Sequence, residues 1–271
     1  MIADHEAQIA FEELYNKNQL VPRIYEHFAS TDGVIYHFEH NEIDVKFGIS
    51  LMVQMVIHKR AAVSVLVGIL HKHFDTMQEC ADMLLVAINA NVVDYSMTSG
   101  VCILRHDIPD SLAHELEIYQ YPLPLLVEPG KVTKNTETGY FSELSKTGSL
   151  ILKNNHTEDD ICLDHLNRVN KIEYSINNLT ANMVKNKWAN LDKKKPTETV
   201  QDFSKRTKAF QKFNRSVKEI YDHLNVFANR FFLTNKYDKR GRVYNQAYHC
   251  NPQGNDYAKA TIEFANKELI V

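Results

Sequence analysis

One short segment of the sequence combines residue types that can hold a phosphate group or the edge of a base. Asp238, Gly241 and Arg242 give the spacing Asp-x-x-Gly-Arg, with Arg240 inside it and Tyr244 just after it. Its glycine lets the backbone approach a ligand closely, and arginine presents a planar fork of donors that fits phosphate oxygens and base edges. The pattern predicts a turn that leads into a strand. Taken by itself it is also typical of an ordinary surface turn, so the surrounding sequence has to decide.

Positive charge gathers in the stretch that ends at this turn. Of the 31 basic and 34 acidic residues, 16 and 6 lie between Lys185 and Arg242, which gives this block a net charge of +10. The rest of the chain has 15 basic against 28 acidic residues, a net charge of −13. A basic block on an acidic body is typical of an element that binds a polyanion. A solvated helix face would have the same composition, and that alternative stays open on composition alone.

The basic block also has the apolar period of a helix. Apolar residues recur at steps of three and four from Leu166 to Met183 and again from Phe203 to Phe231, and a Lys-Lys-Lys-Pro turn separates the two runs. We expect two long helices, the first ending at about Asn190, that form an antiparallel hairpin. Most of the aromatic residues of this stretch fall on its apolar seam and are expected to belong to a core rather than to a base-stacking platform. A coiled-coil dimerisation element is the alternative.

The cations of this hairpin are expected on its outer face, where they would suit phosphate better than a like-charged partner. Lysine and arginine in such a place neutralise phosphates without reading sequence. The residues are Lys193, Lys194, Lys205, Arg206, Lys208, Lys212 and Arg215.

The sequence as a whole predicts a mainly α fold with a small β component. Helices are expected over residues 4–20 and 49–74 and from the capping box Thr76-Met77-Gln78-Glu79 to about Tyr95, a hairpin over 34–47, and strands at 101–104 and 149–152. The most apolar run is interrupted by His58-Lys59-Arg60, whereas about 20 apolar residues are needed to span a bilayer. No membrane partner is therefore expected. No secretory signal is expected either, because residues 1–13 contain four acids and no lysine or arginine.

Metal ligation and thiol chemistry find little support in the sequence. The four cysteines form no Cys-x-x-Cys pair, so neither a zinc site nor a disulfide framework is predicted. His71 and His73 would point apart on a helix, and His249-Cys250 is interpreted as a packed pair. No metal-binding residue is assigned to this chain.

The turn at Asp238 belongs to a longer pattern. Phe227-Ala228-Asn229 precedes it, the turn continues as Arg242-Val243-Tyr244, and Asn251-Pro252-Gln253-Gly254-Asn255-Asp256 follows. This pattern resembles the start of the palm in the single-subunit RNA polymerases of bacteriophages (the T-seven type) and mitochondria. The clear resemblance covers about residues 225–257, and a looser one extends back to about residue 122.

The resemblance implies three segments along the chain. Residues 1–165 would form a helical N-terminal domain, residues 166–230 the thumb that tracks a nucleic-acid duplex, and residues 231–271 the first part of the palm sheet. The first 120 residues show no resemblance to the family.

The resemblance also implies a role for each residue of the motif. Arg242 would contact the template strand and the RNA–DNA hybrid, Gly241 would allow that approach, and Asp238 would fix the turn. Arg240 and Tyr244, as neighbours of Arg242, would support its contact with the nucleic acid. This sequence departs from the family at position 239, where Lys239 stands in place of an aromatic residue.

Catalysis, by the same resemblance, needs a second chain. The family's two metal-binding aspartates lie well beyond the motif, and two-metal transfer depends on such carboxylates. We therefore expect no catalytic residue here, and we expect a small subunit of a split, heterodimeric DNA-directed RNA polymerase similar to that of the N-four-type coliphages. A large partner subunit would carry the rest of the palm, the fingers and the Mg²⁺ ions.

Further expectations follow from a role in phage transcription. The DNA template and the RNA transcript would be partners, with a single-stranded-DNA-binding or activator protein as a further candidate partner. The enzyme would work in the cytoplasm of the infected bacterial host. The alternative is a stand-alone nucleic-acid-binding transcription regulator derived from a truncated polymerase.

Overall fold

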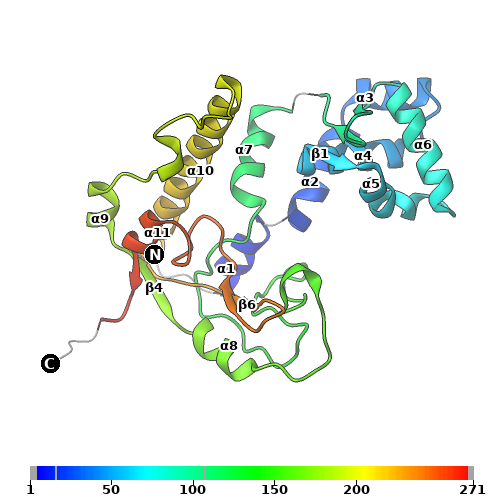
Figure 1. Ribbon diagram of the computed structural model, residues 1–271. Coiled ribbons are helices and arrows are strands. Elements are labelled where there is room, and N and C mark those ends of the chain that lie inside the picture. The colour runs from blue at the N-terminus through cyan, green and yellow to red at the C-terminus, as the bar shows by residue number, and fades with distance from the viewer. Residues whose placement is uncertain (1–4, 16, 107, 268–271) are drawn as a thin grey trace. The chain divides into compact units, whose positions relative to one another are not determined.

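The computed structural model describes residues 5–15, 17–106 and 108–267 and divides into two compact units (Figure 1). Unit 1 comprises Met1–Asn16 and Glu117–Val271, and unit 2 comprises Lys17–Leu116. Helices predominate in the described residues, and the strands form small antiparallel sheets. The expected fold class, mainly α with a small β component, is confirmed. The segment expected as an N-terminal domain contributes to both units.

Unit 2 consists of helices around one small sheet. Its elements are α2 (Lys17–Ala29), α3 (Asp32–His40), α4 (Val45–His58), β1 (Arg60–Ala62), α5 (Val63–Leu70), α6 (Met77–Asn89), β2 (Asp94–Ser96) and β3 (Val101–Ile103). The strands pair in the order β1-β3-β2. α4 is buried over most of its length and packs against α2, α3 and α5, so it forms the centre of this unit's core. α7 (Asp110–Tyr119) leads from unit 2 into unit 1.

Two expectations for unit 2 are wrong. The segment 34–47, expected as a hairpin, contains the end of α3, a short connection at 41–44 and the start of α4, where Asp44 caps the helix by accepting a hydrogen bond from the Phe47 amide at 2.8 Å. The single helix expected over 49–74 is divided, because Lys59 in the charged triplet has a left-handed φ of 60°. Arg60–Ala62 then pairs with Val101–Ile103 and forms a strand.

The capping box at the start of α6 is confirmed. Thr76 Oγ1 accepts from the Glu79 amide at 3.2 Å, and Glu79 Oε2 accepts from the Thr76 amide at 3.3 Å. The helix ends at Asn89 rather than near Tyr95, because Asp94–Ser96 joins the sheet beside β3. No helix in the described part of the chain combines the length and the apolar character needed to cross a membrane.

Unit 1 contains the turn and the basic block. Its elements are α1 (His5–Glu12), α8 (Leu163–Asn170), β4 (Glu173–Ile176), α9 (Asn178–Met183), α10 (Val200–Val226), β5 (Phe231–Phe232), β6 (Asn235–Tyr237), β7 (Val243–Asn245), α11 (Asp256–Thr261) and β8 (Ile262–Phe264). One sheet has the order β5-β4-β8, and β6 and β7 form a separate two-stranded sheet. The helix expected over 4–20 is two helices in different units, α1 and α2. At 149–152 only Ile151 makes a bridge, to Tyr237.

The expected antiparallel hairpin of two long helices is wrong, since only the second helix, α10, forms. Ile172 and Ile176 fit a helical stripe, but with Tyr174 they also alternate as in a strand. The alternation decides the structure, because β4 pairs with both β5 and β8. The Asn177 side chain then accepts from the Thr180 amide at 2.9 Å and begins the short helix α9.

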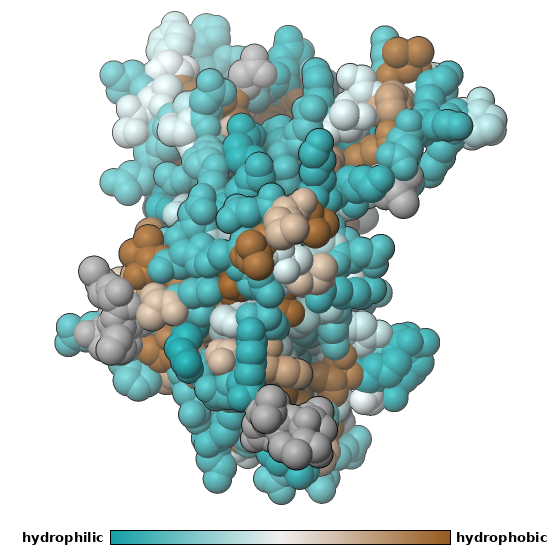
Figure 2. Space-filling view, turned by 90° about the vertical axis from the view of Figure 1, so that its left-hand side faces the viewer, coloured by the Kyte–Doolittle hydropathy of each residue, from teal (hydrophilic) through white to brown (hydrophobic). Residues whose placement is uncertain are grey.

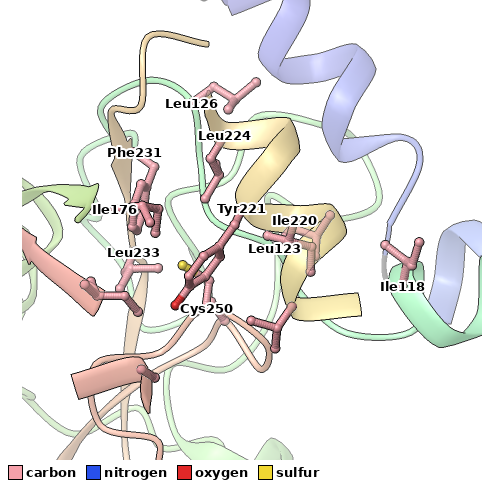
Figure 3. Close-up of a cluster of buried hydrophobic side chains, with 14 of the residues drawn as sticks. Ile118, Leu123, Leu126, Ile176, Ile220, Tyr221, Leu224, Phe231, Leu233 and Cys250 are labelled. Atoms are coloured by element: carbon pink, nitrogen blue, oxygen red, sulfur yellow. The ribbon is translucent and has the colours of Figure 1, made fainter. Parts of the chain in front are cut away.

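The C-terminal part of α10 anchors unit 1. Its buried side chains pack with residues of β4, β5 and the segments after α7 and β7 (Figure 3). The residues labelled in that cluster are Ile118, Leu123, Leu126, Ile176, Ile220, Tyr221, Leu224, Phe231, Leu233 and Cys250. The Tyr221 hydroxyl is satisfied by the Thr261 hydroxyl at 2.8 Å. A separate cluster of Val132, Leu150, Leu166 and Tyr237 lies under β6 and fixes the position of the turn.

Candidate nucleic-acid interface

The turn predicted at Asp238 joins β6 to β7. The Asp238 amide donates to the Arg242 carbonyl at 2.8 Å, and the Gly241 amide donates to the Asp238 carbonyl at 3.0 Å. Gly241 has a φ of 78°, which favours glycine, and a Cβ added there would meet no atom within 4 Å. The glycine is therefore required by its backbone angle, and the space outside it is open to a ligand.

Asp238 organises the two arginines of the turn. Its Oδ1 accepts from the amides of Arg240 (2.8 Å) and Arg242 (3.0 Å), and its Oδ2 accepts from Arg242 Nε at 2.8 Å. Arg240 Nη2 lies 3.2 Å from the same Oδ2. Partial burial raises the pKa of Asp238, but hydrogen bonds from the Arg242 amide and guanidinium outweigh it, and the net pKa is lowered. The ionised carboxylate thus holds the arginine in one orientation.

The register of β6 and β7 places Lys236 and Tyr244 on one face of this sheet and Tyr237 and Val243 on the other. Lys236 lies opposite Tyr244, and Tyr237 lies opposite Val243. Cross-strand partners share a face, so Tyr237 and Val243 face the apolar cluster while Lys236 and Tyr244 lie on the other side. Lys236 is half-buried, and this burial lowers its pKa.

The Arg242 side chain is held on two sides and half exposed. Its guanidinium carbon lies 5.6 Å from the centre of the Tyr244 ring, within the range of a cation–π contact. Its side chain is 52% exposed, and its Nη2 lies 2.7 Å from Asp238 Oδ2. Arginine has five N–H donors, so donors remain for a further partner.

Gln253 supports the outer edge of β7, a role that the motif reading did not assign. Its Oε1 accepts from the Asn245 amide at 3.0 Å and its Nε2 donates to the Val243 carbonyl at 3.1 Å, as a neighbouring strand would. In the sequence, Gln253 lies within the string Asn251–Asp256, which follows the turn and belongs to the same family pattern.

Most of the expected phosphate-binding cations of the basic block have partners within the protein. Arg206 forms a two-pronged ion pair with Glu198, at 2.9 and 2.8 Å. The hydrogen bond from Arg206, helped by the Lys195 amide, lowers the pKa of Glu198 to about 2. Lys194 Nζ donates to the Glu198 carbonyl at 3.0 Å.

Two further cations of α10 share one acid. Lys212 and Arg215 both contact the carboxylate of Glu117, the latter at 2.9 Å. Partial burial raises the pKa of Glu117, whereas the hydrogen bonds from both cations lower it, and the lowering prevails. Among the described residues, Lys193, Lys205 and Lys208 are exposed and have no such partner.

Cationic residues nevertheless form one stripe on α10. Lys205, Lys208, Lys212 and Arg215 follow at steps of three and four, so they share a helix face. The aromatic residues of the block are packed instead. Trp188 lies against Phe210 and Phe213 at centroid distances of 5.1 and 5.6 Å, as expected for core rather than for a base-stacking platform.

The residues beside the turn leave two hollows. One, of about 560 Å³, is lined by Cys162 and His165 together with Asp238, Lys239 and Gly241. The other shares Asp238 and Lys239 with it. In the described part of the chain no group of three or more His, Cys, Asp or Glu side chains is placed to hold a metal ion.

Unit 1 also exposes apolar side chains away from the turn. Leu179 and Met183 of α9 are 72% and 75% exposed, and Phe264 of β8 is 60% exposed. These elements lie on the left of Figure 1, the side turned to the viewer in Figure 2, where brown residues interrupt a mostly teal surface. β8 is an edge strand of its sheet within the described residues.

Comparison with known proteins gives a partial match. No family model matches the sequence. The chain is 27% identical over 174 residues to a protein of Agaricus bitorquis named "Probable DNA-directed RNA polymerase". The match covers 55% of this chain and 16% of that protein, so the chain spans a small part of the relative's length. Over about half of its length, therefore, the chain is similar to a protein named as a probable DNA-directed RNA polymerase.

Proposed function

We propose that this chain holds the DNA template and the RNA–DNA hybrid in a DNA-directed RNA polymerase of the single-subunit, T-seven type. One observation carries the proposal: Arg242 is fixed between Asp238 and Tyr244, yet remains half exposed on a turn that is open to a ligand. The similarity to a protein named as a polymerase supports the same class of function at a coarser level.

The chemistry of Arg242 suits a hybrid duplex. Asp238 accepts from Nε and Nη2, so the remaining N–H groups can donate to phosphate oxygens or to 2′-hydroxyls. The 2′-hydroxyl is the group by which a protein distinguishes an RNA-containing duplex from DNA. Because Asp238 orients the guanidinium before binding, less conformational freedom is lost when the ligand arrives.

The surrounding charge would add affinity without sequence preference. Around Asp238 the turn carries Lys239, Arg240 and Arg242, so its net charge is positive although one acid is present. The exposed lysines of the α10 stripe, Lys205 and Lys208, could contact phosphates farther along a duplex. Such contacts position a duplex, and they weaken as salt rises.

We further propose that a large partner subunit supplies the Mg²⁺-binding carboxylates, as in the split phage enzymes that the sequence resembles. Asp238 is unsuited to hold Mg²⁺, because both of its oxygens are already occupied by arginine donors. The exposed apolar residues of α9 and the edge of β8, which no other described strand pairs with, offer surface that such a partner could cover. A partner docked there would bury an otherwise unpaired strand edge. The assembly would act in the cytoplasm of an infected bacterium.

The proposal is tested by binding. The full chain is titrated against a fluorescent RNA–DNA hybrid with a single-stranded template overhang, using wild type, Arg242→Ala and Lys259→Gln. Lys259 is an exposed lysine of α11 with a 3.7 Å contact to Asp256, so it serves as a charge-matched control. We expect Arg242→Ala to bind at least tenfold more weakly and Lys259→Gln to bind within twofold of wild type. Equal affinity of all three proteins would remove the assigned role.

Affinity purification from the producing cells tests the proposed assembly. A polypeptide that carries metal-binding aspartates and co-purifies in equal amount supports the heterodimer. Purification of a monomer that binds nucleic acid alone would favour the stand-alone regulator.

A further inference from the structure

A cationic hollow of about 480 Å³ lies beside the Asp238 turn. Lys153 and Asn155 line it from one segment, and Asp238, Lys239, Arg240 and Tyr244 line it from the turn. Three of these side chains are cations, and the one acid already accepts from Arg240 and Arg242. The hollow therefore has an excess of positive charge with no acid free to balance it.

Lys153 has a backbone conformation that lysine rarely adopts. Its φ is 64° and its ψ is 30°, in the left-handed region that disfavours side chains with a Cβ. Its side chain is exposed, and no described residue pairs with it. Strained non-glycine residues cluster at functional sites, so an unpaired cation in this conformation points to a function.

The segment that carries Lys153 is fixed to the turn. Ile151 forms a bridge with Tyr237, and the Tyr237 amide donates to the Leu150 carbonyl at 2.9 Å. Asn155 Nδ2 donates to the Leu152 carbonyl at 2.7 Å and closes the chain around Lys153. Lys153 is thus held beside the hollow by the same strand, β6, that leads into the turn.

Lys239 adds a second lysine to the hollow, and this one comes from the turn itself. The Lys239 side chain is exposed and has no described partner. The hollow thus has two exposed lysines, Lys153 and Lys239, for which the described residues provide no partner.

We propose that the hollow lined by Lys153, Lys239 and Arg240 binds the phosphate backbone of a nucleic-acid strand that also contacts Arg242. Tyr244 borders both places, because its ring lines the hollow and lies 5.6 Å from the Arg242 guanidinium carbon. One strand could therefore pass from Arg242 along Tyr244 into the hollow. The inference rests on the proposed function and adds Lys153 and Lys239 to its phosphate contacts.

Lys153→Gly is the decisive variant. Glycine adopts a φ of 64° without strain, so the substitution removes the cation while it favours the native backbone. The full-length variant is titrated with a labelled 20-nucleotide single-stranded DNA at several salt concentrations, beside Lys239→Gln and the control Lys259→Gln. We expect both hollow variants to bind at least threefold more weakly at low salt. The slope of log K against log salt should become shallower by about 0.7 for each.

The test separates this inference from the proposed function. Unchanged affinity and slope in both Lys153→Gly and Lys239→Gln would overturn the phosphate site. If Arg242→Ala still weakened hybrid binding in that case, the proposed function would stand without the phosphate site in the hollow. If Arg242→Ala also had no effect, both would fall.

Inorganic tripolyphosphate distinguishes a strand from a free phosphate compound. We expect it to compete with the DNA weakly, at millimolar concentration, because it engages the hollow without the Arg242 contact. If Lys153→Gly lost tripolyphosphate affinity but kept strand affinity, the hollow would serve a free phosphate compound and the proposal would be wrong.

Discussion

Glu12 is a buried acid that anchors α1 in unit 1. Replacing it should lower the free energy of unfolding of unit 1 by an amount that follows from the hydrogen bonds it accepts. Its side chain is fully buried. Its oxygens accept from the Phe141 amide at 2.9 and 3.0 Å, from the Ser142 amide at 2.7 Å, and from Gln8 Nε2 at 3.0 Å. The Gln8 Oε1 in turn accepts from the Leu126 amide at 2.6 Å. Glu12 thus ties α1 to the loop at Phe141 and Ser142, and it holds the Gln8 side chain that ties α1 to the loop at Leu126.

Glu12→Ala should destabilise unit 1 because it leaves three donors without an acceptor: the backbone amides of Phe141 and Ser142 and the side-chain amide of Gln8. A buried donor without a partner costs about 1–3 kcal/mol. The Ser142 amide and Gln8 Nε2 are buried and the Phe141 amide only partly so, which gives a total loss of about 3–6 kcal/mol. Glu12→Gln keeps the size of the side chain but turns an amide donor toward these donors, and it should lose about 1–3 kcal/mol.

Urea unfolding followed by tryptophan fluorescence measures this loss, because the single tryptophan, Trp188, is packed in unit 1 against Phe210 and Phe213. The neighbouring acid Glu13 is exposed, so Glu13→Gln is the matched control and should stay within about 0.5 kcal/mol of wild type. If Glu12→Gln and Glu13→Gln unfolded at the same urea concentration, the reasoning about the buried carboxylate would be refuted.

Two further predictions concern pH and charge. Burial among aromatic rings lowers the pKa of His249 to about 4, whereas a histidine in the unfolded chain has a pKa of about 6.5. Between these values the unfolded chain binds a proton that the folded protein does not. Unit 1 should therefore lose stability as the pH falls from about 6.5 toward 4. His249→Gln should flatten that pH dependence, as judged by urea midpoints across the range, and an equally steep dependence in this variant would contradict the prediction. Glu117→Gln releases Lys212 and Arg215, so it should tighten single-stranded DNA binding roughly threefold or more. The slope of log K against log salt should become steeper by about 0.7–1.4. A slope equal to that of the control Glu143→Gln would contradict this prediction.

Local signals predicted structure well in this chain. The capping box at Thr76 and the turn at Asp238 depend on side chains within a few residues of each other, and both form as expected. The packing of Trp188 also followed from the spacing of its aromatic partners. Where all the hydrogen bonds that define an element lie within a few neighbouring residues, the sequence is enough to predict that element.

The wrong predictions concern segments whose structure depends on pairing with residues far away in the sequence. Ile172 and Ile176 satisfy a helix and a strand equally, and the choice was made by β8, whose partner residues come more than 80 positions later in the chain. The ion pairs of α10 also depend on distant residues. The sequence indicates the cationic stripe of α10, but not the pairing of Lys212 with Glu117, which lies 95 positions away.

The candidate site could be predicted only in part. Arg242, Gly241 and Asp238 were found by their motif, and the structure adds how Asp238 divides its oxygens between backbone and guanidinium. Lys153 had no signal in the sequence, since a left-handed φ at a lysine cannot be read from residue type. It comes beside the turn only through the bridge between Ile151 and Tyr237.

Photo-crosslinking tests the central claim most directly. The full chain is bound to an RNA–DNA hybrid with 4-thiouridine in the RNA strand and thiothymidine in the template strand, irradiated, digested and mapped by mass spectrometry. We predict crosslinked peptides that contain the turn from Asp238 to Tyr244, and their loss in Arg242→Ala. Crosslinks confined to peptides without this turn, at equal yield in both proteins, would contradict the account.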